Sequence, residues 1–174
     1  ACRLNNDTGE RIYNPLFKYS EFYRFYNALI HDERLLRVMQ EKGYRGKFFL
    51  HTHHKVQLKD FTGNDIIEVM QQGIDYQEEF RNNALLVTDF SSVAFDFAYL
   101  KKPVIYAQFD KDTFFQGQVY SEGYFDYERD GLGPVCYDYE STIEALIHAI
   151  ENDCVLDPLY DERGNAFYRW FDQD

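Results

Sequence analysis

Cysteine is scarce in this 174-residue sequence, and long hydrophobic runs are absent from it. The three cysteines, Cys2, Cys136 and Cys154, are far apart in the chain and match no metal-ligand spacing. This usage is not that of a disulfide-stabilised secreted domain, and it predicts a reducing compartment, the cytoplasm. No stretch approaches the roughly 18 apolar residues that a membrane-spanning helix needs, so no span is predicted.

Positive charge is also in short supply. Lys and Arg number 18 against 30 Asp and Glu, which gives a formal net charge of -12 at pH 7. Such a chain does not attract nucleic acid or an anionic bilayer non-specifically, so a phosphate ligand would need local hydrogen-bond donors. Apolar side chains, by contrast, make up 45% of the chain and aromatic ones 18%. Together with the length, they predict one folded domain over residues 1–174.

Apolar residues recur in patterns that alternate between helix and strand. Helical spacing runs through residues 19–43, with Ser20 as N-cap and Gly43 as stop, and predicts one long amphipathic helix. Short apolar runs predict strands at residues 47–51, 65–70, 84–88 and 103–107. Further helices are predicted at residues 76–81, 92–100, 141–151 and 158–171, with Ser141 or Thr142 as the cap of the third.

This order of strands and helices predicts an α/β fold. The strands are continuous apolar runs rather than alternating ones, as in a parallel sheet that is covered on both faces. The sequence therefore predicts a Rossmann-like parallel sheet with helices on both faces. Residues 109–138, which are dense in Gly, Asp and aromatics, form a segment longer than an ordinary connection and are predicted to be functional.

The stretch LLVTDFSSVAFDFA, residues 85–98, places polar side chains between an apolar strand and an apolar helix. A strand that ends at Thr88 and a turn through Asp89, Ser91 and Ser92 put hydroxyls and backbone amides at the carboxyl edge of a parallel sheet. Ligands bind at that edge in open α/β folds, and a helix N-terminus there favours phosphate. The alternative is that Ser91 or Ser92 merely caps the helix and Asp89 holds the turn.

Asp96 is the only charged residue between Val93 and Leu100. Burying a carboxylate without a partner is unfavourable, so it needs a polar neighbour. One interpretation pairs it with Lys101, Lys102 or a backbone donor. The other gives it a role in ligand binding or in bracing the turn.

Histidines cluster at His51, His53 and His54, just after a predicted strand. In an extended chain, His51 and His53 would point one way and His54 the other. A metal site is disfavoured because no carboxylate or cysteine stands close in sequence. Donation to a phosphate or proton transfer is favoured, with an ordinary polar loop as the alternative.

The stretch SEGYFDYERDGLGP, residues 121–134, mixes glycines with charged and aromatic side chains. Gly123 breaks regular structure, while Asp126 and Arg129 supply hydrogen-bonding groups. Such a loop can close over a ligand, or it can be a surface loop held by its own aromatics.

The segment TDFSSVAFDFAYLKKPVIY resembles the TDYSSVxFDxAxLKRPxxF motif of the CDP-glycerol glycerophosphotransferase family, the teichoic acid polymerases and primases of bacterial envelopes. Phe90 stands where the family usually has Tyr. HTHH resembles a strand-end His-Pro segment of the family, with His53 at the matched histidine and His54 in place of proline. GYFDYERDGLGP is similar to a third family stretch, so the resemblance spans residues 14–171.

The resemblance implies a GT-B architecture, which consists of two Rossmann-like halves. This chain resembles the C-terminal half, which binds the nucleotide donor. It is therefore expected to be a fragment of a larger two-domain transferase, and to be inactive without its N-terminal half.

The resemblance also implies a reaction. Polyol phosphate passes from CDP-glycerol, or a related CDP-polyol, to a hydroxyl of a teichoic-acid-like or capsular polymer or a lipid-linked saccharide, and CMP is released. No cofactor, metal or nucleic acid is implied. The full-length protein is expected to be peripheral on the cytoplasmic face of the cell membrane.

The resemblance assigns roles to particular residues. His53 is expected to be catalytic. The donor and its phosphates are expected to lie against Thr88, Asp89, Ser91, Ser92 and Asp96. Gly123, Asp126 and Arg129 are expected in a ligand loop.

Two other classes of function remain open on the sequence. The chain could belong to another GT-B glycosyltransferase that uses a nucleotide-sugar donor, or it could be a noncatalytic interaction module that binds partners through its acidic surface.

Overall fold

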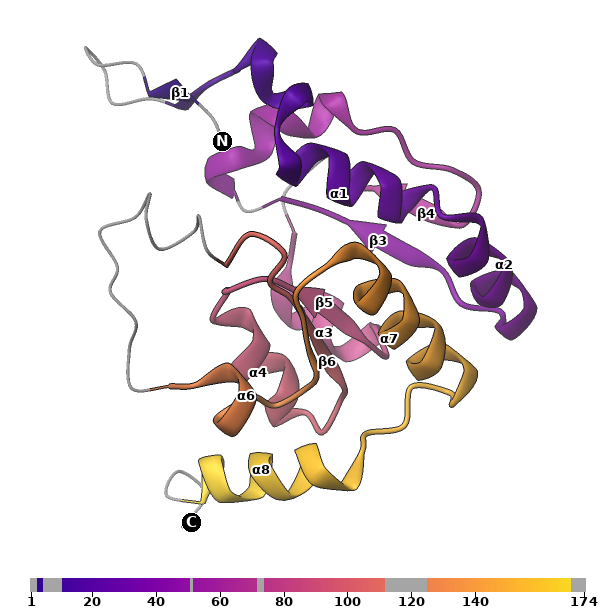
Figure 1. Cartoon of the computed structure of the whole chain (residues 1–174), viewed down its shortest axis with the longest axis vertical. Coiled ribbons are helices and arrows are strands. Elements are labelled where there is room, and N and C mark those ends of the chain that lie inside the picture. The colour runs from indigo at the N-terminus through magenta and orange to yellow at the C-terminus, as the bar shows by residue number, and fades with distance from the viewer. Residues whose placement is uncertain (1–2, 5–10, 51, 72–73, 112–124, 170–174) are drawn as a thin grey trace. The chain divides into compact units, whose positions relative to one another are not determined.

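The computed structural model describes residues 3–4, 11–50, 52–71, 74–111 and 125–169 (Figure 1). The chain divides into two compact units, residues 1–75 and 76–174, and each is described by itself. No helix among the described residues is long and apolar enough to cross a membrane.

Unit 1 contains a short antiparallel strand pair, a run of helices and a parallel strand pair. In chain order its elements are β1 (Arg3–Leu4), β2 (Arg11–Ile12), the 3-10 helix η1 (Pro15–Tyr19), α1 (Glu21–Ile30), α2 (Glu33–Lys42), β3 (Gly46–Phe48), the 3-10 helix η2 (Thr52–Asp60) and β4 (Ile67–Val69). Strands β3 and β4 are parallel, with Gly46 opposite Ile67 and Phe48 opposite Val69.

The predicted single helix over residues 19–43 is wrong, because the chain breaks it into α1 and α2. Asp32 starts α2, since its carboxylate accepts from the backbone amides of Arg34 (2.9 Å) and Leu35 (3.2 Å). The two predicted ends are confirmed. Ser20 caps α1, and Gly43 ends α2 at φ 75° in the left-handed region, which glycine adopts without strain.

Gln57 and Asp60 form a buried polar network in unit 1. The Gln57 side chain is 0% exposed, and its Oε1 accepts from the backbone amide of Asn14 at 2.6 Å. Its Nε2 donates to Asp60 Oδ2 (3.1 Å) and to the Asn14 carbonyl (3.3 Å). Tyr13 donates to Asp60 Oδ1 at 2.8 Å. Both ends of this buried amide are therefore satisfied.

Unit 2 is a parallel three-stranded sheet with helices. In chain order its elements are α3 (Tyr76–Asn82), β5 (Leu86–Thr88), α4 (Val93–Tyr99), β6 (Val104–Ala107), α6 (Tyr127–Asp130), β7 (Val135–Cys136), α7 (Tyr139–Glu151) and α8 (Pro158–Tyr168). The strand order is β5-β6-β7, with Thr88 opposite Tyr106 and Ala107 opposite Cys136. The predicted α/β class with parallel strands is confirmed.

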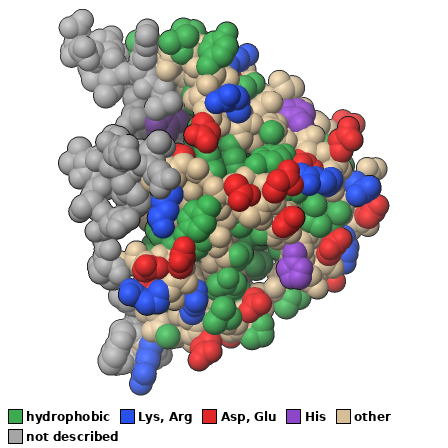
Figure 2. All heavy atoms as spheres, in the orientation of Figure 1, with side chains coloured by type: hydrophobic (Ala, Val, Ile, Leu, Met, Phe, Trp, Pro, Cys, Tyr) green, Lys and Arg blue, Asp and Glu red, His purple; other side chains and the backbone are tan. Residues whose placement is uncertain are grey.

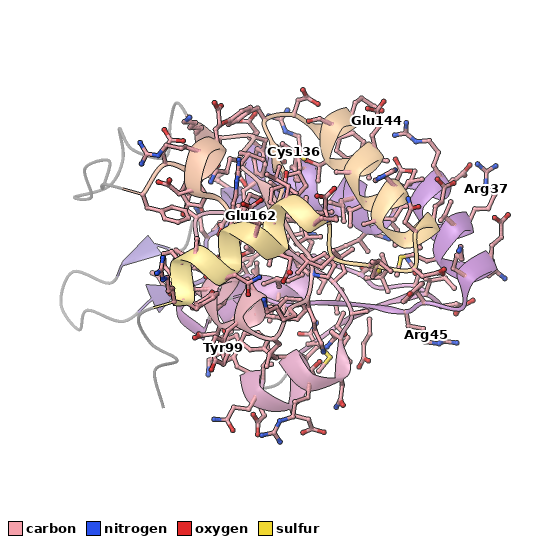
Figure 3. All side chains as sticks on the ribbon, turned by 90° about the horizontal axis from the view of Figure 1, so that it is seen from below. Arg37, Arg45, Tyr99, Cys136, Glu144 and Glu162 are labelled. Carbon is pink, nitrogen blue, oxygen red and sulfur yellow. The ribbon has the colours of Figure 1, made fainter. Side chains whose placement is uncertain are left out.

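Helices cover both faces of β6. Val104 and Tyr106 pack in one core cluster with Phe97 of α4. Side chains alternate along a strand, so the other residues of β6 face the opposite side, where α7 contacts the sheet. The buried residues of α7 are Thr142, Ile143, Leu146 and Ile150, whereas its Glu144 lies on the outside (Figure 3).

Several predicted boundaries in unit 2 are corrected. Helix α7 begins at Tyr139 and is capped by Asp138, not by Ser141 or Thr142. The Asp138 carboxylate accepts from the Ser141 backbone amide at 2.8 Å, and the Ser141 hydroxyl completes a capping box. The segment 109–138, expected as one long connection, contains α6 and β7.

Gly164 and Gly43 offer a matched test of helix stability. An added Cβ meets nothing within 4 Å at either glycine, but only Gly43 has a positive φ. Gly164→Ala is expected to raise the free energy of unfolding by about 0.5–1 kcal/mol, because alanine costs less backbone entropy inside α8. Gly43→Ala is expected to lower it by about 1 kcal/mol. Urea denaturation measures both, and stabilisation by Gly43→Ala would contradict the assigned cap.

Candidate functional site

The turn between β5 and α4 lies at the carboxyl edge of the sheet in unit 2, as the sequence predicts. Strand β5 ends at Thr88, and α4 begins at Val93. Thr88, Asp89 and Ser91 are half-buried, and Ser92 is exposed. Since ligands bind at this edge in open α/β folds, the turn is the candidate site.

The Ser92 hydroxyl does not cap α4. Ser92 occupies the N-cap position with helical angles, φ -65° and ψ -15°, and makes no side-chain capping hydrogen bond. The serines support the helix start through their carbonyls, since Ser91 O accepts from Ala94 N (3.3 Å) and Ser92 O from Phe95 N (3.1 Å). The capping interpretation is therefore wrong for Ser92, whose exposed hydroxyl is not needed to begin the helix.

Asp89 braces the turn from within. Burial raises the pKa of its carboxyl, and hydrogen bonds from the backbone amides of Asp89, Phe90 and Ser91 partly oppose that rise. The carboxylate thus organises the amides of the turn, at the expense of being desolvated.

One aromatic ring from α6, that of Tyr127, packs beside this turn. The Phe90 and Tyr127 rings meet edge to face at 5.9 Å, and Tyr127 meets Tyr106 at 5.1 Å. Burial and then the nearby Asp89 carboxylate raise the pKa of Tyr127. The structure therefore brings the described part of the predicted ligand loop next to the predicted phosphate turn.

Tyr106, whose ring contacts that of Tyr127, is 0% exposed. Burial raises the pKa of Tyr106 to about 12. Its hydroxyl has no hydrogen-bond partner among the described residues. The backbone of Leu132 opposes part of the rise in the pKa.

The polar residues of the predicted ligand loop are engaged within α6. Asp126 caps that helix by accepting from the amides of Glu128 and Arg129, both at 2.9 Å. Arg129 is exposed and pairs with Asp130, holding the pKa of that carboxyl near 2. Gly123 lies outside the described residues. A ligand role for these residues stays a prediction.

Asp96 is exposed on α4 rather than buried. Its expected lysine partners bind elsewhere, because Lys101 pairs with Asp161 at 2.7 Å and Lys102 binds backbone carbonyls. The pairing of Asp96 with Lys101 or Lys102 is therefore wrong, and so is the premise that this carboxylate is buried. A ligand role for Asp96 remains a prediction.

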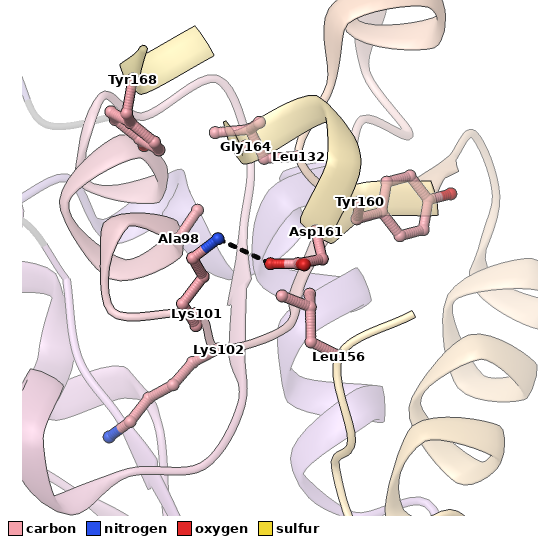
Figure 4. Close-up of a pocket in the computed structure, with 9 residues that line it drawn as sticks. All are labelled: Ala98, Lys101, Lys102, Leu132, Leu156, Tyr160, Asp161, Gly164 and Tyr168. Carbon is pink, nitrogen blue, oxygen red and sulfur yellow. Dashed lines mark hydrogen bonds and ion pairs between the residues drawn. The ribbon is translucent and has the colours of Figure 1, made fainter. Parts of the chain in front are cut away.

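The two lysines after α4 anchor neighbouring helices. Lys101 sits at φ 59° and reaches Asp161 and Asn165 on α8, beside a small cavity of about 10 Å³ (Figure 4). Lys102 points the other way, and its Nζ donates to the carbonyls of Phe80, Arg81 and Asn83 at 2.7–2.8 Å. This part of the TDFSSVAFDFAYLKKPVIY segment holds the scaffold.

His53 belongs to unit 1, where the backbone of residues 52–60 forms η2. The expected extended arrangement of His53 and His54 is therefore wrong, since a 3-10 helix does not alternate side chains between two faces. The side chains of His51 and His53 lie outside the described set. A catalytic role for His53 stays a prediction.

Charged side chains offer no obvious metal site. Within the part of the chain that the structure describes, no three His, Cys, Asp or Glu side chains gather as metal ligands would.

On the face shown in Figure 2, acidic and basic side chains are interspersed.

Sequence reasoning missed Gln108, which follows β6 directly and is 1% exposed. Neither polar atom of its side chain has a partner among the described residues. A single glutamine after the apolar run PVIYA matches no motif; the available signal was its place at the end of a predicted parallel strand.

The chain matches the family described as CDP-glycerol:poly(glycerophosphate) glycerophosphotransferase over residues 3–174, which confirms the predicted resemblance. It is 39% identical over 166 residues to the minor teichoic acid biosynthesis protein GgaB of Bacillus subtilis (strain 168), covering 95% of this chain and 18% of that protein. It is 32% identical over 173 residues to the teichoic acid poly(glycerol phosphate) polymerase of the same strain, covering 92% and 22%.

A third relative is the teichoic acid glycerol-phosphate transferase of Staphylococcus aureus (strain NCTC 8325 / PS 47), 30% identical over 124 residues, covering 70% of this chain and 30% of that protein. The chain thus spans less than a third of the length of each of these relatives. No solved structure matches the chain significantly.

Lys102 and Lys101 are predicted to differ in their effect on stability. Lys102→Met removes the ammonium that binds the α3 carbonyls and is expected to lower the free energy of unfolding by about 1.5–3 kcal/mol. Lys101→Met breaks an exposed ion pair and is expected to cost about 0–1 kcal/mol. Urea denaturation measures both, and equal effects would contradict the anchoring role of Lys102.

Asp89→Asn is predicted to stabilise unit 2 at neutral pH. Burial raises the pKa of Asp89 in the folded chain above the unfolded-state pKa of about 3.9. The stability that the protonated carboxyl contributes is therefore fully present below about pH 3.9 and is lost as the pH rises through the folded-state pKa. Asparagine keeps an acceptor and carries no charge. Thermal melts from pH 4 to pH 8 should show a gain in Tm that shrinks toward pH 4, whereas a loss of Tm at pH 7 would show that the carboxylate is needed by the turn.

Proposed function

This chain belongs to the CDP-glycerol:poly(glycerophosphate) glycerophosphotransferase family, and from this premise we propose that it binds CDP-glycerol or a related CDP-polyol. It then serves as the donor-binding part of an enzyme that transfers polyol phosphate to a teichoic-acid-like polymer. The relatives named as glycerol-phosphate transferase and polymerase support this assignment.

One observation carries the proposal. The TDFSS part of the family motif forms a strand–turn–helix at the carboxyl edge of a parallel sheet, with a Ser92 hydroxyl that the helix start does not use. A pyrophosphate needs hydrogen-bond donors, and the hydroxyls of Thr88, Ser91 and Ser92 can supply them. The backbone amides held by Asp89 add to the polarity of the turn.

The proposed reaction is a displacement at phosphorus. A hydroxyl oxygen of the acceptor attacks the β-phosphorus of CDP-glycerol, the bond from that phosphorus to the CMP oxygen breaks, and CMP leaves as an anion. The acceptor hydroxyl gives its proton to a general base. Catalysis of such a step rests on positioning and on stabilising phosphate charge, which is the task assigned to the turn.

A catalytic role is proposed for His53, through donation of a hydrogen bond or a proton, as the family resemblance implies. By analogy with the family, the general base that activates the acceptor comes from the rest of a longer protein. A contact with the donor is also proposed for Asp96, Asp126, Arg129 and Gly123, as the family resemblance implies.

The surfaces that bind the acceptor and the membrane are also assigned to the rest of the longer protein. A polyol-phosphate or lipid-linked saccharide acceptor would bring the enzyme to the cytoplasmic face of the membrane. With its net charge of -12, this chain is not attracted to an anionic leaflet, so the docking surface is assigned to the N-terminal part of a GT-B enzyme.

Calorimetric titration tests donor binding directly. The chain is expected to bind CDP-glycerol and CMP but not a UDP-sugar, because the proposed site takes a cytidine donor. Binding of the UDP-sugar alone would favour a nucleotide-sugar glycosyltransferase. A chain that binds none of these ligands would contradict the proposal.

Ser92→Ala locates the phosphate contacts. It is expected to weaken CDP-glycerol binding by about 1.5–3 kcal/mol, the worth of a charge-assisted hydrogen bond, and to leave Tm unchanged. Ser20→Ala is the control, because Ser20 caps α1 and accepts from Tyr23 N at 3.2 Å. That variant should lose about 1 kcal/mol of stability and keep its affinity. A loss of Tm without a loss of affinity in Ser92→Ala would restore the capping interpretation.

A further inference from the structure

Gln108 is a buried carboxamide whose hydrogen-bonding capacity the described residues leave unused. It is 1% exposed, and neither its Oε1 nor its Nε2 has a partner among them. Native proteins pair the great majority of buried polar atoms, and exceptions occur where a group has another task. A ligand that satisfies both atoms must donate a hydrogen bond to Oε1 and accept one from Nε2.

The position of Gln108 places it at the candidate site. Its backbone amide donates to the Cys136 carbonyl at 2.8 Å, so the parallel ladder continues one residue beyond β6. Side chains alternate along such a ladder, which puts Gln108 on the face of Tyr106. Since Tyr106 lies opposite Thr88, Gln108 follows β6 at the same edge of the sheet at which the Asp89–Ser92 turn follows β5.

Gln57 shows what a structural buried glutamine looks like in the same chain. It is 0% exposed, and its amide is satisfied by Asn14 and Asp60. The difference between the two glutamines is therefore one of pairing and not of burial.

We propose that Gln108 is a specificity-determining residue of the donor site and that its carboxamide binds a pair of hydroxyls on the CDP-polyol. This inference rests on the proposed function. A phosphate only accepts hydrogen bonds and would leave Oε1 unpaired, whereas vicinal hydroxyls can accept from Nε2 and donate to Oε1. Such a pair occurs both on the polyol and on the ribose of the donor.

Gln108→Leu separates a ligand-binding role from a structural one. Leucine fills a similar volume without unpaired polar atoms, so Tm is expected to stay unchanged or to rise. Affinity for CDP-glycerol is expected to fall about tenfold or more, because the hydroxyl pair loses its partner. Gln57→Leu is the matched control: it should lower Tm clearly, because Asn14 and Asp60 lose their partner.

Titration with CMP locates the hydroxyl pair. If Gln108→Leu weakens CDP-glycerol but not CMP, the pair is on the polyol; if it weakens both equally, the pair is on the ribose. Gln108→Asn, which retains the amide but withdraws it by one methylene, is expected to keep its Tm and to weaken binding as well.

Two results would overturn the inference while leaving donor binding intact: wild-type affinity for both ligands in the Gln108 variants, or a loss of Tm in Gln108→Leu as large as that in Gln57→Leu. A wild-type chain that binds neither CDP-glycerol nor CMP would overturn the proposed function itself, and with it this role for Gln108.

Discussion

The architecture of unit 2 depends on the burial of β6 on both faces. All four of its residues, Val104 to Ala107, are at most 2% exposed. A strand buried in this way needs a helix on each side, and α4 and α7 supply them. Parallel pairing of β6 with β5 and β7 then brings the carboxyl ends of the three strands to one edge. For this reason the Asp89–Ser92 turn after β5 and Gln108 after β6 share one edge of the sheet.

The family motif combines two physical roles. Its TDFSS part forms the turn at the sheet edge, where hydroxyls and amides are available to a ligand. Its KKP part holds the surrounding elements, since Lys102 binds the end of α3 and Lys101 binds α8. A turn that binds phosphate, as we propose for TDFSS, must hold its donors in place, and the second part of the motif anchors neighbouring helices.

Unfavourable polar burial is concentrated at this same edge. The Asp89 carboxyl is desolvated, and the Gln108 amide has no partner among the described residues. The hydroxyl of Tyr106, on β6, also lacks a partner among the described residues. Two other buried polar side chains are paired: Gln57 binds Asn14 and Asp60, and the Thr142 hydroxyl donates to the Asp138 carbonyl at 2.8 Å. Buried polar side chains without hydrogen-bond partners are typical of functional sites, where the side chains are placed to bind a ligand rather than to stabilise the fold.

Local patterns were sufficient for the fold class and for several boundaries. Apolar runs predicted β5 and β6, and the cap at Ser20 and the stop at Gly43 are confirmed because they act through the nearest backbone groups. Local patterns failed where two signals competed. Asp32 splits a helical pattern by capping a second helix, and Asp138 displaces Ser141 as the cap of α7.

The sequence by itself determined the α/β class, the strand–turn–helix around Asp89 and the membership of a family, because periodicity and motif spacing are local properties. Only the tertiary structure decided that Asp96 is exposed, that Lys102 anchors α3 and that Gln108 is buried without a partner among the described residues. Burial and pairing depend on which distant segments pack together, and a side chain's own sequence neighbourhood does not record that.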